Sequence, residues 1–188
     1  MDIKQYAHEN HVPIMLDDGL AFLLNYIKEH DIKTILEIGT AIGYSSMQMA
    51  KLNKNIKIDT LEINPEMYEL ALKNIQEAKL EKQISCHLID ALDFVSDSQY
   101  DLVFVDGAKG KYRRYLEHFL PNSKLFIFDN LEFHGIVDNP ELTNNRNTKS
   151  LVKKIRTFRD EILKDPNFKC EYHKNVGDGI LVLKTNQY

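Results

Sequence analysis

A short apolar run that ends in closely spaced small residues, at 35–45, constrains the fold of this chain more than any other stretch. It reads Ile-Leu-Glu-Ile-Gly-Thr-Ala-Ile-Gly-Tyr-Ser and passes into a helical pattern. Such a sequence is typical of a β-strand, a tight turn and the start of a helix. Gly39, Ala41 and Gly43 suit a backbone that doubles back close to a ligand, where Cβ atoms have little room. The stretch therefore predicts a strand-to-helix turn that is either a ligand site or a plain structural corner.

One acidic residue inside this run, Glu37, narrows the range of ligands. A carboxylate near the helix N-terminus would repel a dinucleotide pyrophosphate but would suit an ammonium or sulfonium group. S-adenosylmethionine carries both of these groups. Ala41 and Glu37 also fit a dinucleotide loop poorly, which disfavours an NAD-dependent dehydrogenase. S-adenosylmethionine is therefore the cofactor that we expect at this turn.

Alternating strand and helix patterns predict a parallel sheet with helices on both faces. Apolar runs typical of strands follow at 56–62, 84–89, 101–106 and 124–130. Apolar residues at helical spacing predict helices over 45–52, from Pro65 to about Ile75, and around Leu151, Ile155, Phe158 and Ile162. An earlier helix, with Leu20, Leu23, Leu24 and Ile27 on one face, is expected to be capped by Asp17 or Asp18.

The end of the chain predicts a β-hairpin, because strand-like runs at 168–176 and 180–184 flank a Gly-Asp-Gly turn at 177–179. The fold class is therefore α/β and Rossmann-like, with a seven-stranded, mostly parallel sheet that ends in an antiparallel hairpin. A chain of 188 residues with 43% hydrophobic content is long enough for one well-buried core. We expect a single domain over 1–188, in which 1–30 form an N-terminal cap segment and helix.

Net charge, cysteine content and the N-terminal sequence limit the partners and the cellular compartment that we expect for this chain. The net charge is −4, so any binding of nucleic acid must depend on a local basic patch. Cys86 and Cys170 lie far apart in apolar, strand-like segments, which favours reduced thiols in the cytoplasm over a disulfide framework. The first residues lack the apolar core of a signal peptide, and no stretch approaches the length of a membrane span. The expectation is a soluble cytoplasmic protein with no membrane partner.

Acidic residues end several of the predicted strands. Glu62 ends the second strand about 20 residues past the glycines, where a carboxylate can accept both ribose hydroxyls of a bound nucleoside. Asp90 and Ala91 follow the third strand, and the Asp90 carboxylate is a candidate partner for an adenine amino group. Taken alone, Asp90 would be an ordinary loop acid.

The next two strands end in oxygen-bearing side chains, namely Asp106 and the pair Asp129-Asn130. Ligands of open α/β sheets collect beyond the carboxyl ends of the strands, so these three side chains should converge on the side where Glu62 already points. Three hard oxygen ligands suit magnesium or calcium better than zinc. The alternative is that each acid only caps the helix after it, but their coincidence on adjacent strands favours a metal site.

Two basic clusters stand out in a chain of negative net charge. One contains Lys109, Lys111, Arg113 and Arg114. The other contains no acid and consists of Arg146, Lys149, Lys153, Lys154, Arg156 and Arg159. Each is either a solvated face or a surface that binds nucleic-acid phosphates.

A proline-restrained apolar segment at 12–15, which ends in Met15, precedes the first long helix. It is either a staple of the core or an apolar cover over the cofactor.

Three motifs carry a family resemblance. They are 36–45 (Leu-Glu-Ile-Gly-Thr-Ala-Ile-Gly-Tyr-Ser), 105–112 (Val-Asp-Gly-Ala-Lys-Gly-Lys-Tyr) and Asp129-Asn130. Together they resemble the metal-dependent class I O-methyltransferases of the catechol and caffeoyl-CoA type. Within that group the sequence is most similar to the bacterial tRNA 5-hydroxyuridine methyltransferases, from 6–15 to the Val-Gly-Asp-Gly at 176–179.

The resemblance implies roles for individual residues. Asp106, Asp129 and Asn130 would be the ligands of Mg²⁺ or another divalent cation, Lys109 the candidate base, and Asp106 would also lie near the methionine amino group. The implied S-adenosylmethionine site consists of Met15, Glu37, Gly39, Ala41, Gly43, Ser45, Glu62, Asp90, Ala91, Asp106 and Tyr115. Two departures are a glycine at 107, after the first ligand, and an N-terminus shorter than that of relatives.

The implied reaction is methylation of 5-hydroxyuridine at the tRNA wobble position to 5-methoxyuridine, by a homodimer. The anticodon stem-loop would then contact Lys111, Arg113, Arg114, Arg146, Lys149, Lys153 and Arg156. One alternative is an O-methyltransferase of catechol-like small molecules with the same metal site. Another is a non-catalytic RNA-binding module, which would have no need for the full set of metal and cofactor residues.

Overall fold

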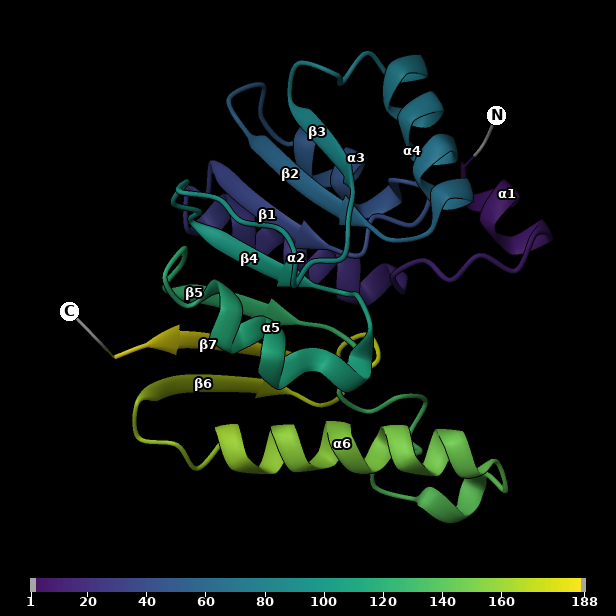
Figure 1. The fold of residues 1–188 in the computed structure, drawn as a ribbon, viewed down its shortest axis with the longest axis vertical. Helices are drawn as coiled ribbons and strands as arrows, with labels where there is room; N and C mark the ends of the chain where they lie inside the picture. The colour runs from purple at the N-terminus through teal and green to yellow at the C-terminus, as the bar shows by residue number, and fades with distance from the viewer. Residues whose placement is uncertain (1–2, 187–188) are drawn as a thin grey trace.

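The computed structural model describes residues 3–186 and contains a seven-stranded sheet of order β3-β2-β1-β4-β5-β7-β6 (Figure 1). Strands β1 to β5 are parallel to one another, whereas β7 is antiparallel to both β5 and β6. The predicted fold class and the C-terminal hairpin are thereby confirmed. The strands are β1 (Thr34–Ile38), β2 (Lys57–Glu62), β3 (Ile84–Leu88), β4 (Leu102–Val105), β5 (Leu125–Phe128), β6 (Phe168–His173) and β7 (Ile180–Thr185).

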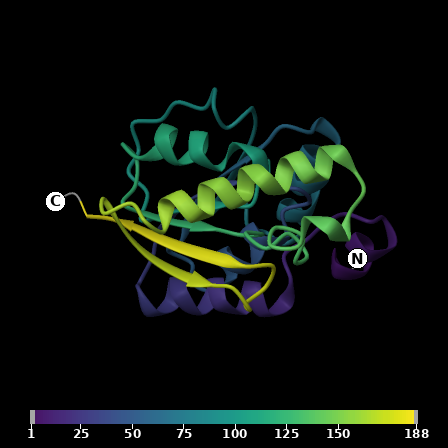
Figure 2. The same ribbon diagram turned by 90° about the horizontal axis from the view of Figure 1, so that it is seen from below.

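Helices cover both faces of the sheet, and Figure 2 shows α2 on one face and α5 and α6 on the other. The α-helices are α1 (Ile3–Glu9), α2 (Asp17–Glu29), α3 (Tyr44–Lys51), α4 (Pro65–Glu77), α5 (Tyr112–Phe119) and α6 (Arg146–Ile162). Two short 3₁₀ helices are η1 (Lys109–Lys111) and η2 (Pro140–Leu142). No helix of the described residues is both long and apolar enough to cross a membrane.

The core consists of two apolar layers, one on each face of the sheet. Successive strand residues point to opposite faces, so Ile127 packs in the layer under α2 and α3, while Phe126 and Phe128 pack in the layer under α5 and α6. All three side chains are fully buried. This burial on both faces explains why the central strands are almost wholly apolar.

The start of α2 differs from the predicted aspartate cap. The N-cap residue is Leu16, which has no side chain to accept a hydrogen bond, and Asp17 and Asp18 lie in the first turn. Asp18 Oδ2 instead accepts a hydrogen bond of 2.9 Å from the backbone N–H of Gly177. The cap prediction was wrong because this aspartate joins α2 to the turn between β6 and β7.

Both cysteines, Cys86 and Cys170, are free and half-buried thiols, as their positions in β3 and β6 predicted. Arg159, by contrast, does not belong to a basic surface. Its guanidinium is buried and forms ion pairs of 2.9 Å with Glu132 and 2.7 Å with Asp138. An interior guanidinium needs such partners because an unpaired buried charge is strongly destabilising.

Candidate active site

A cavity of about 540 Å³ lies at the carboxyl edge of the parallel strands. This is the edge at which ligands of open α/β sheets bind. The residues predicted for the cofactor that line it are Met15, Gly39, Ala41, Glu62, Asp90, Ala91, Asp106 and Tyr115. Those predicted for the metal and for catalysis, Asp106, Lys109, Asp129 and Asn130, line the same cavity. The structure therefore brings the two predicted sets of side chains together.

The turn after β1 approaches the loop after β4 so closely that both need glycine. Gly39 has a left-handed φ of +101°, and a Cβ atom on it would lie 2.7 Å from the carbonyl oxygen of Asp106. A Cβ atom on Gly107 would lie 2.9 Å from the side chain of Ile38. The glycine at 107, a departure from the family pattern, is therefore required by this close approach.

The carboxylate of Glu37 is not among the groups that line the cavity, and its predicted contact with the cofactor stays a prediction. Glu37 is fully buried, and its oxygens accept hydrogen bonds from the hydroxyls of Ser45 (2.5 Å), Thr60 (2.6 Å) and Ser46. These donors come from α3 and β2, so Glu37 holds the turn in place from below. Gly43 likewise does not line this cavity and forms the N-cap of α3, while Ser45 borders a small adjoining hollow.

Burial raises the pKa of Glu37 from 4.5 to about 7, against the opposing effect of its three hydroxyl donors. The folded state therefore binds a proton that the unfolded state releases near pH 4.3. Stability should fall as pH rises from about 4 to 7, because ionisation of the folded protein is then penalised. Glu37→Gln removes this penalty. In urea denaturation, the free energy of unfolding of the variant minus that of wild type should therefore be larger at pH 8 than at pH 5. A pH-independent difference would contradict this prediction.

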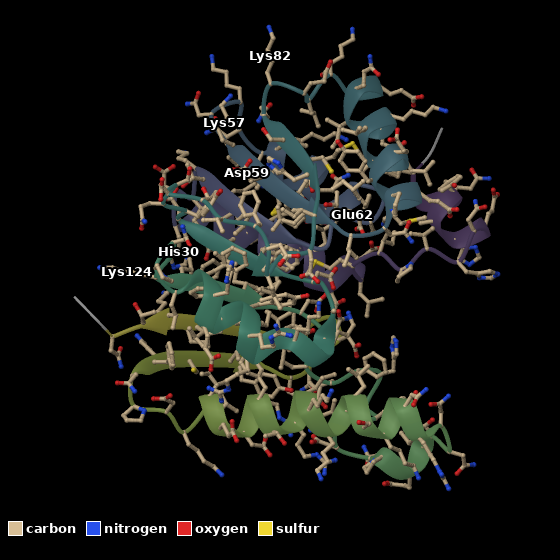
Figure 3. The ribbon with its side chains drawn as sticks, in the orientation of Figure 1. His30, Lys57, Asp59, Glu62, Lys82 and Lys124 are labelled. Carbon is tan, nitrogen blue, oxygen red and sulfur yellow. The ribbon has the colours of Figure 1, made fainter. Side chains whose placement is uncertain are left out.

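Glu62 stands at the carboxyl end of β2, whereas Asp59 lies nearer the start of that strand (Figure 3). Backbone N–H groups fix its carboxylate: Ala41 donates to Oε2 at 2.8 Å, and Ile63 and Asn64 donate to Oε1 at 2.9 and 2.8 Å. Oε2 accepts only one of these bonds and retains a lone pair for a ligand hydroxyl. This geometry fits the predicted role at a ribose.

Asp90 reaches the cavity but already has a charged partner. Its Oδ2 lies 2.8 Å from Lys111 Nζ, and its Oδ1 accepts a bond of 3.0 Å from the N–H of Leu92. The hydrogen bond from Lys111 lowers the pKa of Asp90. Both side chains line the cavity, so a bound adenine would meet this ion pair rather than a free carboxylate.

The proline-restrained segment 12–15 packs in the core, and its position at the cavity is compatible with the predicted cover over the cofactor. Met15 is buried in the core layer under α2, and it also lines the cavity together with Pro13 and Ile14. The segment is thus an apolar wall of the site as well as a staple of the core.

Asp106, Asp129 and Asn130 form the polar end of the cavity. Asp129 is almost fully buried, and its Oδ1 accepts a bond of 2.7 Å from the N–H of Asn130, which adopts a left-handed φ of +63°. Burial, with the nearby charge of Asp106, raises the pKa of Asp129 to about 7. Burial also raises the pKa of Asp106, and the ammonium of Lys109 opposes that rise. Two desolvated carboxylates side by side create a demand for positive charge.

Lys109 supplies one such charge. Its Nζ lies 2.5 Å from Asn130 Oδ1 and 3.5 Å from Asp106 Oδ1. Residues 3–186 contain no group of three or more His, Cys, Asp or Glu side chains that is arranged to hold a metal ion. The donor set of two carboxylates and one amide oxygen nevertheless fits a hard divalent cation that keeps water or substrate oxygens among its ligands. Asp106, Asp129 and Asn130 are the residues that would hold it.

Phe133, His134 and Asp178 also line the cavity, and the sequence reasoning did not assign them to the site. Phe133 and His134 belong to a loop with left-handed φ values, 45° and 58°. Asp178 belongs to the Val-Gly-Asp-Gly turn, which the sequence marked as a hairpin turn and as part of the resemblance. Its acidic residue between two glycines was the signal that could have indicated a role in the site.

Three of the seven predicted RNA contacts already have partners. Lys111 pairs with Asp90, Arg113 Nη2 lies 2.6 Å from Glu161 Oε2, and Arg156 Nε donates a 2.8 Å bond to the carbonyl oxygen of Val137. The guanidinium of Arg156 fastens α6 to the preceding loop, and its predicted contact with RNA stays a prediction. Among the basic residues of the two clusters, those that are exposed and show no ion pair within residues 3–186 are Arg114, Arg146, Lys149, Lys153 and Lys154.

Comparison with known proteins agrees with this site. Residues 2–186 match the O-methyltransferase family. A catechol O-methyltransferase of Niastella koreensis is 31% identical over 67% of this chain and 59% of its own length. A provisionally named caffeoyl-CoA O-methyltransferase structure from Staphylococcus aureus is 33% identical, with a TM-score of 0.93 over 98% of this chain and 90% of that one.

A further structure, an O-methyltransferase from Bacillus cereus in complex with SAH, shares the fold at 23% identity. Its TM-score is 0.80, over 98% of this chain and 89% of that one. The family match spans both halves of the cavity, the glycine turn after β1 and the acidic residues after β4 and β5. The chain belongs to the O-methyltransferase family.

Proposed function

We propose that the protein is an S-adenosylmethionine- and Mg²⁺-dependent O-methyltransferase that methylates 5-hydroxyuridine at the tRNA wobble position. The observation that carries the proposal is one cavity with two chemically different ends. Gly39, Ala41 and Glu62 form an end suited to a nucleoside, and Asp106, Asp129 and Asn130 form an end suited to a hard cation. The SAH in the Bacillus cereus relative supports the same cofactor here.

Within this reaction the chain's own residues mainly position the reactants. When bound, S-adenosylmethionine would supply the methyl group and leave as S-adenosylhomocysteine, and a divalent cation held by Asp106, Asp129 and Asn130 would lower the pKa of the substrate hydroxyl. Glu62 and the glycine turn orient the nucleoside, while Tyr115 and Met15 shield it from water. Holding both reactants in line can supply about 7–11 kcal/mol of barrier reduction. The ammonium of Lys109 is placed to offset negative charge that develops on the substrate oxygen, and only as a neutral amine could Lys109 receive the hydroxyl proton.

A basic groove next to the site supports a nucleic-acid substrate. It has a volume of about 390 Å³, lies between α5 and α6, and is lined by Lys153, Lys154 and Arg113. Lys109 lines both the groove and the main cavity, so the groove adjoins the catalytic end. A strand that follows these side chains would bring a nucleoside to the site with its phosphates on cations.

The alternative is a catechol-like small molecule, which the similarity to the catechol O-methyltransferase of Niastella koreensis favours. A catechol presents two adjacent oxygens, as does a 5-hydroxyuracil with its hydroxyl and neighbouring carbonyl, so both suit one cation. Methyl transfer to bulk tRNA against transfer to a catechol separates the two. The homodimer and the cytoplasmic location stay predictions.

Reversing two groove charges should distinguish the substrates further. Lys153→Glu with Lys154→Glu should raise the KM for tRNA and lower the salt slope of binding by about one unit for each lost phosphate contact. The rate on a catechol should not change. Lys164→Glu, on an exposed residue outside the groove, is the matched control. Equal rates on subsaturating tRNA for the double variant and wild type would reject the groove as the docking surface and favour the small-molecule function.

A further inference from the structure

The turn between β6 and β7 is joined to the loop that follows β5. The N–H of Leu131 donates to the carbonyl oxygen of Gly179 at 2.9 Å, and the N–H of Glu132 donates to that of Asp178 at 2.8 Å. Gly179 has a φ of +85°, and a Cβ atom on it would lie 2.8 Å from Glu132 Cγ. The two segments therefore meet at a distance that only glycine permits, and this fixes the backbone of Asp178 beside the cavity.

The side chain of Asp178 is 6% exposed and lines the cavity. Oδ1 accepts a hydrogen bond of 2.6 Å from the N–H of His134, and Oδ2 accepts one of 3.4 Å from Asn130 Nδ2. One carboxylate thus contacts both the rim loop and a candidate metal ligand. None of the reaction steps above uses it.

Two charged neighbours determine which way the Asn130 amide faces. The ammonium of Lys109 only donates hydrogen bonds, so it must face Oδ1, and the measured separation is 2.5 Å. The carboxylate of Asp178 only accepts, so it must face the amide nitrogen. A flipped amide would turn its NH₂ group, which cannot bind a cation, toward the ammonium of Lys109.

We propose that Asp178 is a positioning residue for the divalent cation, because it holds the Asn130 amide with Oδ1 directed at the ligand set. This inference rests on the metal-dependent function proposed above. Outer partners of metal ligands orient them in this way, and their loss costs about 10- to 100-fold in metal affinity.

Asp178→Asn tests this role with almost no change in side-chain volume. Its amide oxygen still accepts from His134, but its NH₂ group would then oppose that of Asn130. We expect the Kd for Mg²⁺, measured by calorimetry on the full chain, to rise about 10- to 100-fold. Asp138→Asn is the matched control. Asp138 lies in the loop between β5 and α6 and forms an ion pair with Arg159, but it does not contact Asn130. The control should lower the melting temperature and leave the Kd for Mg²⁺ unchanged.

A second test, in the Asn130→Asp background, distinguishes loss of the Asn130 amide orientation from a general loosening of the site. In Asn130→Asp the two oxygens are equivalent and need no orienting acceptor, and the new carboxylate is repelled by Asp178. Adding Asp178→Asn to Asn130→Asp should therefore tighten Mg²⁺ binding, the reverse of its effect in the wild-type background. A wild-type Kd in Asp178→Asn, or equal weakening in both backgrounds, would overturn this inference alone. Failure of the wild-type chain to bind Mg²⁺ at all would overturn the proposed function as well.

Discussion

Replacing Asp129 by alanine should abolish methyl transfer while the protein stays folded. Asp129 follows β5 at the carboxyl edge of the sheet, where its carboxylate faces the cavity and contributes little to either core layer. A metal ion stabilises the charge that develops in the transition state by several kcal/mol. Loss of one of its ligands should therefore lower kcat/KM by at least about 100-fold, since each 1.36 kcal/mol added to the barrier lowers the rate tenfold. Asp106→Ala should have the same effect. Radiolabelled methyl transfer measures the loss, and circular dichroism checks the fold.

Measuring cofactor binding distinguishes the loss of a metal ligand from misfolding of the Asp129→Ala variant. Glu62 and the turn after β1 are unchanged in Asp129→Ala, so S-adenosylmethionine should still bind in calorimetry. Asp93→Ala, on an exposed loop outside the cavity, should retain full activity. An active Asp129→Ala variant would remove this residue from the metal site.

Lys109→Arg should lower kcat by about 10²–10⁴-fold if Lys109 receives the hydroxyl proton, because arginine keeps the charge but cannot accept a proton near neutral pH. The Lys109 ammonium lies 2.5 Å from Asn130 Oδ1 and 3.5 Å from Asp106 Oδ1, among the proposed metal ligands. Lys109→Met, which removes the charge as well, should be no more active than Lys109→Arg.

The pH profile of kcat decides between the two roles of this lysine. A proton acceptor should produce a limb on the acidic side of the wild-type profile that is missing from the residual activity of Lys109→Arg. A Lys109→Arg enzyme within a few fold of wild type, with an unchanged profile, would show that Lys109 acts through its charge alone.

The sequence predicted most of the sheet and of the candidate site because both follow from local patterns. The apolar runs of β4 and β5 and the acids after them are contiguous in the chain. Parallel pairing of these strands then places Asp106 and Asp129 at one edge without any knowledge of the packing. The glycines at 39 and 43 could be recognised in the same way, since their left-handed φ values belong to a local turn.

The failures depend on contacts between residues far apart in the chain. The sequence did not show that Glu37 is fully buried, with hydrogen bonds from a hydroxyl of β2, 23 residues away, and from two hydroxyls of α3. Arg159 looked like part of a basic face, yet Glu132 and Asp138 draw it into the interior. Asp178 lies 48 residues from Asn130. No periodicity or spacing in the sequence reports such pairs.

The central claim is that methyl transfer requires a divalent cation held by Asp106, Asp129 and Asn130. The most direct test is the rate of SAH formation by the wild-type enzyme on tRNA and on a catechol, first in EDTA and then after addition of excess Mg²⁺. We expect activity on the true substrate to disappear in EDTA and to return with Mg²⁺. Full activity in EDTA would contradict the claim.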